Sequence, residues 1–255
     1  MPKITVDHVT KYYYPSPRRW FRRKKHRELG VADVSFTVEQ GEFVFVIGSS
    51  GAGKSTLMKL LAGQSTPDRG TVKVGGRNIL KLGVGGRYRL PLLVGYVSQQ
   101  HSMNPRLTVE ENLRIAAKIG RKKFRDEGDH GERIRKVLGL VGLPGVEKRY
   151  PVELTSGECR RIELARTLIN SPPILVLDEV TANLDADSMW DMYLLLNEIN
   201  QMGTTIIMST HNSDYVNMLR RRVIMLVDGH MYSDEIKGRY GETKKSVIRP
   251  GAVVK

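Results

Sequence analysis

A glycine-rich stretch ending in a lysine and two hydroxyl residues is the strongest chemical signal in the chain. The letters GSSGAGKST at positions 48–56 fit the pattern G-x4-G-K-[ST]. An apolar run precedes them, and the residues after them predict a helix, whose free amide groups and positive dipole end bind polyphosphates. Chance would produce such a match on the order of one time in a hundred chains of this length. We therefore predict a phosphate-binding loop with contacts from Gly48, Ser49, Ser50, Gly51, Ala52, Gly53, Lys54, Ser55 and Thr56.

Two adjacent carboxylates follow a second apolar run, and they supply what such a loop needs for hydrolysis. Residues 174–177 are Ile-Leu-Val-Leu, and Asp178 and Glu179 come directly after them. Lys54 is expected to reach the terminal phosphates, while Ser55 and Asp178 provide oxygen ligands for Mg²⁺. Glu179 is then placed to polarise the attacking water as a general base. The two motifs together predict an ATP site with Mg²⁺ as its cofactor.

The elements that position these residues alternate between strand and helix. Residues 4–9 and 34–38 alternate as antiparallel strands, whereas short, continuously apolar runs predict buried parallel strands. The fold class is therefore α/β, with a mostly parallel core sheet, an antiparallel β subdomain and an inserted α-helical lobe. We expect one domain over residues 1–240, with a core from 1–98 and 172–240 and the lobe over about 99–171. Further strands are expected at 43–48, 71–74, 94–98, 174–178, 204–209, 223–227 and 230–233, and helices at 54–63, within 109–143, and at 156–170, 187–201 and 214–219.

Composition sets limits on the class of protein. The chain has 255 residues, 40% of them hydrophobic, which is enough for a packed core. No apolar run approaches the roughly 20 residues that a membrane-spanning helix needs, and the first residues lack the apolar region of a signal peptide. A single cysteine, Cys159, cannot form an internal disulfide and fits a reducing compartment, where we interpret it as a packing residue. Any membrane association is expected through a partner or through surface charge.

Half of the net charge of +14 lies in one short segment. Seven Lys or Arg residues lie between Arg18 and Arg27, interleaved with Trp20 and Phe21. Such a segment is suited to anionic lipid headgroups, but it also fits nucleic-acid phosphates or a solvated loop. Residues 241–255 are expected to form a basic, flexible tail because they show no apolar periodicity.

The remaining motifs resemble those of the ABC ATPase family. Residues 154–158, Leu-Thr-Ser-Gly-Glu, resemble the signature loop of that family, and they stand about twenty positions before Asp178. Gln99 matches the Q-loop, residues 182–185 (Ala-Asn-Leu-Asp) match the D-loop, and His211 matches the switch histidine. The resemblance covers about residues 3–240, with its motifs in the family order.

The resemblance implies an ATPase that works as a head-to-tail homodimer with ATP at the interface. It assigns Gln99 to the metal and, with His211, to catalysis, and it assigns the adenine stack to Tyr13, although Tyr12 and Tyr14 are neighbouring alternatives. The signature loop of one copy would then cover the nucleotide held by the other copy. The residues implied for that face are Thr155, Ser156, Gly157, Glu158 and Asp185.

Four positions depart from the family pattern. Ser156 stands where a glycine is usual, and a positive φ there would cost on the order of 1 kcal/mol and slow closure. Cys159 follows Glu158 where glutamine is frequent, Val180 replaces a proline after the general base, and Asn212 replaces an aspartate after the switch histidine. None of these changes removes a catalytic group.

Within the family, several strings resemble the FtsE group of bacterial cell-division ATPases. They include residues 41–48, 90–99 and 220–229, together with Gly-Arg-Tyr-Gly at 238–241. This resemblance implies an FtsX-like integral membrane subunit as partner, a peripheral location on the cytoplasmic face of the membrane, and control of peptidoglycan hydrolysis. The basic segment from Arg18 to Arg27 is then a candidate for lipid contact beside that partner.

Two other function classes stay open at this point. One is the ATPase of a lipoprotein-release or macrolide-type transporter, whose relatives share most of these strings. The other is a DNA-associated ABC ATPase, suggested by the charge but disfavoured because the middle lobe is too short for a long coiled coil. We therefore expect no nucleic-acid partner.

Overall fold

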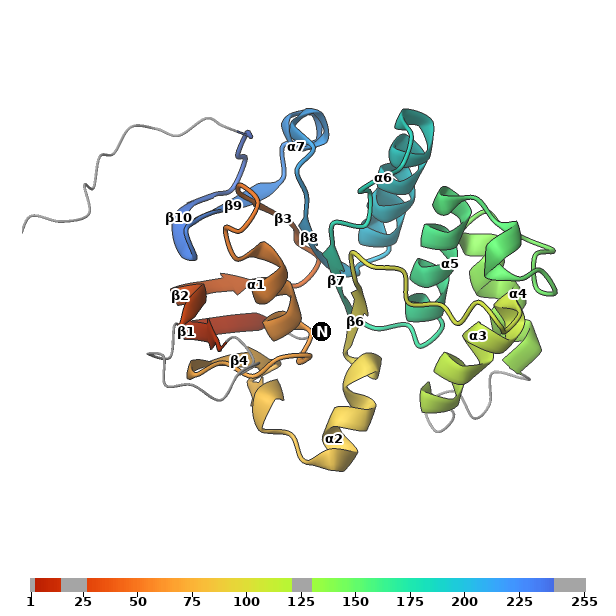
Figure 1. Cartoon of the computed structure of the whole chain (residues 1–255), viewed down its shortest axis with the longest axis horizontal. Helices are drawn as coiled ribbons and strands as arrows, with labels where there is room; N and C mark the ends of the chain where they lie inside the picture. Colours follow the sequence, from red (N-terminus) through yellow and green to blue (C-terminus); the bar gives the residue numbers. More distant parts are fainter. Residues whose placement is uncertain (1–2, 15–26, 121–129, 241–255) are drawn as a thin grey trace, which may run out of the picture.

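A six-stranded core sheet fixes the edge at which the chemically active residues meet (Figure 1). Residues 3–14, 27–120 and 130–240 are described by the computed structural model of the chain. The strand order is β10-β9-β3-β8-β7-β6, and every neighbouring pair is parallel except β10 with β9. The strands are β3 (Phe43–Ile47), β6 (Val94–Val97), β7 (Ile174–Asp178), β8 (Thr205–Ser209), β9 (Arg222–Val227) and β10 (His230–Glu235).

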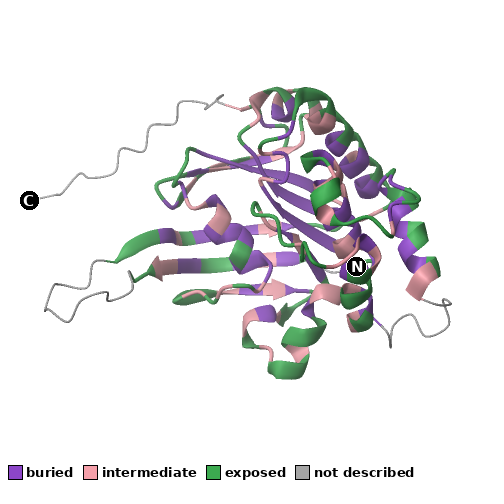
Figure 2. Ribbon diagram, turned by 45° about the vertical axis from the view of Figure 1, so that its right-hand side comes forward, coloured by how far each residue is buried: buried purple, intermediate pink, exposed green. Residues whose placement is uncertain are grey.

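The central strands are continuously apolar because both of their faces are covered. Every residue of β3, β7 and β8 is buried (Figure 2). Phe43 and Phe45 of β3 point into a cluster shared with the helices on one face, whereas Val44 and Val46 point into a second cluster on the other face. This arrangement is what a parallel sheet between two layers requires, and it confirms the predicted fold class.

A second, antiparallel sheet covers helix α1 (Lys54–Leu61) from the side opposite the core sheet. Its order is β2-β1-β4-β5, and all three pairings are antiparallel. Its strands are β1 (Ile4–Tyr13), β2 (Glu28–Val38), β4 (Arg69–Val74) and β5 (Arg77–Asn78). The buried face of α1 therefore packs against both sheets, which fixes its N-terminus beside the end of β3.

Helices α3 (Val109–Ala117), α4 (His130–Leu140) and α5 (Ser156–Leu168) pack together in the predicted lobe. Thr108 and Thr155 begin α3 and α5 with reciprocal capping boxes to Glu111 and Glu158. The apolar faces of these helices share one buried cluster with the core sheet, so the lobe is packed onto the core.

Helix α6 (Ala186–Gln201) also packs into the core cluster, whereas the other remaining helices are short. Helix α6 begins at an Asp185 cap, and α7 (Ser213–Leu219) begins at Asn212. Among the described residues, no helix combines the length and the apolar character needed to cross a membrane. The remaining helices are α2 (Val84–Arg89) and the 3-10 turns Ile79–Lys81, Leu90–Leu92, Lys118–Gly120 and Pro151–Glu153.

The main differences from the sequence-based expectation concern strands β1 and β2 and helix α2. Strand β1 continues to Tyr13 and strand β2 already begins at Glu28, so both are longer than the alternating segments. The additional residues were not predicted because register shifts interrupt the pairing of the two strands and, with it, the alternation of apolar and polar residues. Helix α2 was not predicted, since its Val-Gly-Gly-Arg-Tyr-Arg sequence contains two poor helix formers and buries no residue. The basic segment up to residue 26 and the tail 241–255 lie outside the described residues.

Candidate functional site

The glycine-rich loop connects the end of β3 to the start of α1, as its sequence predicts. Two of its glycines are required by close approach of other backbone segments. A Cβ atom on Gly48 would lie 2.3 Å from the carbonyl oxygen of Leu226, and one on Gly53 would lie 2.2 Å from that of Gly30. Both glycines also have positive φ, 150° and 97°. The loop can therefore curl tightly enough to present its amide groups to a phosphate.

Lys54, the first residue of α1, holds a buried ammonium group at the centre of the site. Its Nζ donates to the carbonyl oxygens of Gly48 (2.9 Å) and Ser49 (3.1 Å) and lies 3.5 Å from Oε1 of Glu179. Burial lowers the pKa of Lys54, and the Glu179 carboxylate opposes that shift. These contacts hold the ammonium in place, and the phosphates of a bound ligand could take over the role of its present partners.

Asp178, the last residue of β7, lies next to the hydroxyl group of Ser55. Its Oδ1 accepts hydrogen bonds from Ser55 Oγ (3.1 Å) and from Ser209 Oγ at the end of β8 (2.8 Å). Tyr96 lies on the other side, its hydroxyl 3.5 Å from Asp178 Oδ2, and burial raises the pKa of Tyr96. Hydroxyl and carboxylate oxygens at this separation are hard donors of the kind that Mg²⁺ prefers, so this pair fits the expected metal.

The carboxylate of Glu179 contacts three side chains from distant parts of the chain, namely Lys54, Gln99 and His211. Its Oε2 accepts from Nε2 of Gln99 (2.9 Å), and its Oε1 lies 2.8 Å from Nε2 of His211. The same histidine nitrogen lies 2.9 Å from Lys54 Nζ. Glu179 has φ 49°, a left-handed conformation that is rare outside glycine and clusters at functional sites. Its backbone N–H donates to Ser209 Oγ (2.9 Å), which holds the residue in that conformation.

A cavity of about 260 Å³ is lined by Lys54, Ser55, Gln99, Glu179 and His211, and also by one of the three consecutive tyrosines, whereas Asp178 lies outside its lining. Tyr13 lines the cavity, and its ring packs against Gly30, where a Cβ would lie 2.9 Å from Tyr13 Cε2. Tyr12 and Tyr14 do not line it, and the Arg27 guanidinium lies 5.8 and 5.9 Å from their ring centres. Of the three tyrosines, Tyr13 is therefore the one that is placed to contact a ligand in this cavity.

Several lining residues escaped the sequence analysis. Glu28, Leu29 and Gly30 reach the cavity from β2, and no local motif marks them, because their position depends on pairing with β1. Ser209 does not line the cavity but contacts Asp178 and Glu179. It could have been found, since it ends a parallel strand next to β7 and stands two residues before His211.

The signature residues lie elsewhere on the chain. Residues 155–158 form the cap and first turn of α5, and none of them lines the cavity. Ser156 is not among the described residues with positive φ, so the strain considered for it does not arise. A Cβ on Gly157 would lie 2.9 Å from Ser188 Oγ, and the backbone N–H of Ser188 donates to the Asp185 cap (2.8 Å). The signature turn and the D-loop thus form one continuous surface.

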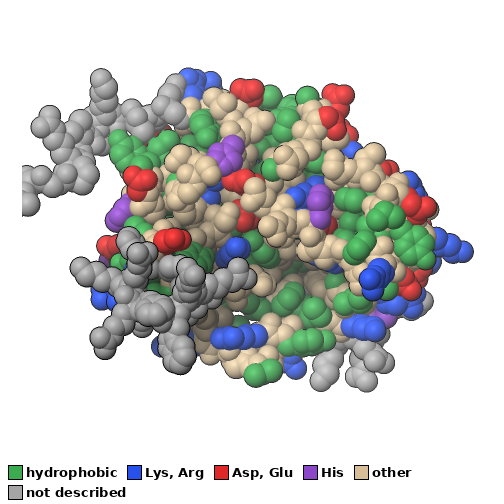
Figure 3. Space-filling model, viewed as in Figure 1, with side chains coloured by type: hydrophobic (Ala, Val, Ile, Leu, Met, Phe, Trp, Pro, Cys, Tyr) green, Lys and Arg blue, Asp and Glu red, His purple; other side chains and the backbone are tan. Residues whose placement is uncertain are grey.

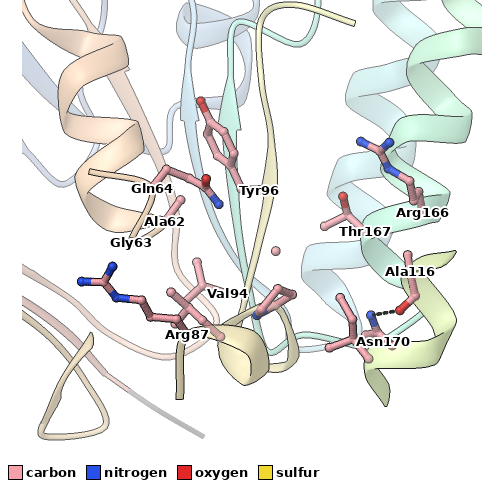
Figure 4. Close-up of a pocket in the computed structure, with 14 residues that line it drawn as sticks. Ala62, Gly63, Gln64, Arg87, Val94, Tyr96, Ala116, Arg166, Thr167 and Asn170 are labelled. Carbon is pink, nitrogen blue, oxygen red and sulfur yellow. Dashed lines mark hydrogen bonds between the residues drawn. The ribbon is translucent and has the colours of Figure 1, made fainter. Parts of the chain in front are cut away.

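A second cavity, of about 410 Å³, is lined by residues of both the core and the helical lobe (Figure 4). Arg87 lines one side and Arg166 the other, and Tyr96 lies between them on β6. The surface is hollowed in this region, with hydrophobic side chains at its base and Lys or Arg side chains near its rim (Figure 3). Three apolar residues that stand close in sequence to the lining residues are exposed: Tyr88 (58%), Leu93 (40%) and Ile115 (55%).

Fold and site together define a P-loop nucleoside triphosphatase: a glycine-rich loop between a buried strand and a helix, with an acid pair on a nearby parallel strand. The protein family described as ABC transporter matches residues 31–182. The chain belongs to this family and is one of its ATPases.

Relatives and solved structures support the same assignment. "Cell division ATP-binding protein FtsE" of Streptococcus pneumoniae D39 is 42% identical over 211 residues, which are 82% of this chain and 89% of the relative. The proteins of the same description from Mycobacterium tuberculosis and Escherichia coli K12 are 39% and 34% identical, covering 93% and 90% of this chain and 98% and 97% of the relatives. The ATP-binding cassette MJ0796, solved as a dimer bound to ADP and Pi, superposes with a TM-score of 0.79 at 26% identity, covering 93% of this chain and all of that chain.

Proposed function

We propose that the chain is the ATP-hydrolysing subunit of an FtsEX-like complex, in which closure of an ATP-bound dimer moves a membrane partner that regulates peptidoglycan hydrolysis. One observation carries the ATPase part: Lys54, Gln99, Glu179 and His211, far apart in sequence, meet within hydrogen-bonding or ion-pairing distance around one cavity. The cell-division part is supported by the FtsE relatives at 34–42% identity over most of the chain. The domain division proposed with it is a core of 1–98 and 172–240 and a lobe of about 99–171.

Nucleotide binding begins with an exchange of partners at Lys54. Its ammonium leaves the carbonyl oxygens of Gly48 and Ser49 for the terminal phosphates of ATP, while the amide groups of residues 48–56 surround the phosphate chain. Ser55, Asp178 and Gln99 are the proposed ligands of Mg²⁺, which neutralises phosphate charge when bound. Hydrogen bonds from the ammonium to backbone carbonyl oxygens are thus replaced by contacts with the phosphates of the ligand.

Hydrolysis follows from the position of Glu179. Its carboxylate accepts a proton from the water that attacks the terminal phosphorus, and the bond to the bridging oxygen of ADP breaks. Gln99 and His211, which contact this carboxylate from two sides, orient the water and the phosphate. The products are ADP and phosphate.

A second copy completes the site. No signature residue of the chain lines its own cavity, so residues 155–158 are free to cover the nucleotide of another copy. Asp185 lies beside them through Ser188 and would take part in the same interface. The dimeric structures of the similar cassette support this arrangement.

Replacing Tyr13 with alanine tests the adenine contact. We expect ATP affinity to fall about 10-fold, because stacking of a base on an aromatic ring contributes about 1–3 kcal/mol. Turnover at saturating ATP should change little, and affinity can be measured by titration with a fluorescent ATP analogue. Tyr14→Ala is the matched control, since that ring is 52% exposed and does not line the cavity. Equal losses in the two variants would contradict the assignment.

The second cavity, lined by residues of the core and of the lobe and called the groove from here on, is the proposed contact for a cytoplasmic segment of the FtsX-like subunit. Its two arginines and exposed apolar neighbours suit an amphipathic segment that carries acidic residues. This contact would place the chain at the cytoplasmic face of the membrane. Contact of the Arg18 to Arg27 segment with anionic lipid headgroups is proposed as a second, independent attachment to the membrane.

Ala116→Trp is expected to block this contact, because Ala116 lines the groove and a bulky ring would fill it. The variant should retain ATP affinity and lose co-purification with the co-expressed FtsX-like subunit in detergent. Ile236→Trp, at a position that is 80% exposed and outside the groove, should retain both. Retained co-purification of Ala116→Trp would place the partner elsewhere.

A further inference from the structure

A buried ion pair lies within helix α5, close to the signature turn but away from the nucleotide cavity. Arg160 and Glu163 are 3% and 1% exposed, and Arg160 Nη1 lies 2.8 Å from Glu163 Oε2. Neither residue lines the nucleotide cavity. Replacing a buried ion pair by apolar residues often leaves stability unchanged or raised, so stability alone does not explain why charges occupy these positions.

The other hydrogen-bonding partners of the pair belong to one short segment, residues 98–102, which follows β6. Arg160 donates to the carbonyl oxygens of Ser98 (2.9 Å) and Gln99. Glu163 Oε1 accepts from the backbone N–H of Ser102 (2.6 Å), and its Oε2 lies 3.3 Å from Nδ1 of His101. The guanidinium therefore holds the start of the segment, and the carboxylate holds its end.

This segment carries the side chain that contacts the proposed general base. Gln99 Nε2 donates to Glu179 Oε2 (2.9 Å), so a continuous set of hydrogen bonds runs from the ion pair to Glu179. Ser98 Oγ also donates to the carbonyl oxygen of Gln100 (2.7 Å), which makes the turn at Gln99 compact. A shift of the segment backbone would move the amide of Gln99 away from the carboxylate of Glu179.

We propose that Arg160 and Glu163 are positioning residues that hold Gln99 against Glu179. They act through the backbone of residues 98–102 and do not touch the nucleotide. This inference rests on the proposed role of Glu179 in activating water. Because residues 155–158 begin the same helix, displacement of the signature turn on dimer closure would be transmitted through this ion pair to Gln99. The ion pair thus links the dimer face to the catalytic carboxylate.

Arg160→Lys tests the proposal in the full-length chain. Lysine keeps the buried positive charge beside Glu163, but it lacks the planar fork that bridges two carbonyl oxygens. We expect kcat for Mg-ATP hydrolysis to fall about 10-fold, because misplacement by about 1 Å can cost about 100-fold and the shift of Gln99 is expected to be smaller, while ATP affinity stays within about 2-fold. Arg161→Lys is the matched control: its guanidinium binds Asp191 on α6 (3.0 Å) and makes no contact with the 98–102 segment, so its kcat should match wild type.

A double-mutant cycle with Gln99→Ala separates positioning from a general structural effect. If the ion pair acts through Gln99, Arg160→Lys should lower kcat by less than about 2-fold in the Gln99→Ala background. The double replacement Arg160→Met with Glu163→Leu substitutes apolar side chains for the buried ion pair and carries the same prediction. It takes the place of Arg160→Lys if that variant does not fold.

Unchanged kcat in folded Arg160→Lys, or the same fold-loss with and without Gln99, would overturn the inference. A wild-type chain that neither binds nor hydrolyses Mg-ATP would instead contradict the proposed function, so this measurement is made first. The two failures are therefore distinguishable.

Discussion

Lys54→Ala is expected to weaken Mg-ATP binding by more than about 100-fold and to remove measurable hydrolysis. The side chain is 4% exposed and its ammonium has only polar or charged partners, so it is already placed for a phosphate. Each charge-assisted hydrogen bond contributes roughly 1.5–3 kcal/mol, and loss of two such bonds to the terminal phosphates accounts for the expected drop. Isothermal titration with Mg-ATP and steady-state phosphate release measure the two effects.

Lys59→Ala is the control for this variant. Lys59 lies on the same helix, α1, but it is exposed and does not line the cavity. Its replacement removes an equal charge from the same element and should leave affinity and turnover within about 2-fold, as expected for surface substitutions. Comparable loss in both variants would indicate that charge on α1, and not the position of one ammonium, governs binding.

Glu179→Gln is expected to separate ATP binding from hydrolysis. The amide keeps the shape of the side chain, but it carries no charge for the ion pair with Lys54, and it cannot accept a proton from water at neutral pH. We expect kcat to fall by about 100-fold to 10,000-fold, the usual contribution of a general base, with ATP affinity retained. Because hydrolysis no longer opens the interface, the variant should accumulate as an ATP-bound dimer, which size-exclusion chromatography with light scattering measures.

Glu198→Gln is the matched control, an exposed carboxylate on α6 outside the cavity. It should hydrolyse ATP at the wild-type rate and show no accumulated dimer. Rapid hydrolysis by Glu179→Gln would remove this residue from the proposed mechanism. A variant that binds Mg-ATP and remains monomeric would show that closure needs the membrane subunit.

Most of the fold and the centre of the site could be predicted from the sequence alone. The glycine-rich loop, the acid pair at 178 and 179 and the apolar strands before them are local patterns, and local patterns depend on backbone geometry and hydrophobic periodicity over a few residues. Parallel strands then bring their carboxyl ends to one edge, so convergence of Lys54 with Glu179 follows from fold class. The order of the motifs was enough to identify the family.

Tertiary structure alone decided the contacts between segments that carry no motif. The position of Tyr13 in the cavity lining depends on the register of β1 against β2, and the contact of Ser209 with Asp178 depends on the pairing of β8 with β7. Arg160 donates a hydrogen bond to Gln99, which is 61 positions away in the sequence. The acceptor is a backbone carbonyl oxygen, so no pattern of side chains in the sequence indicates this contact. Such contacts depend on how helices and strands pack against one another, and packing is a property of the whole chain that short stretches of sequence do not specify.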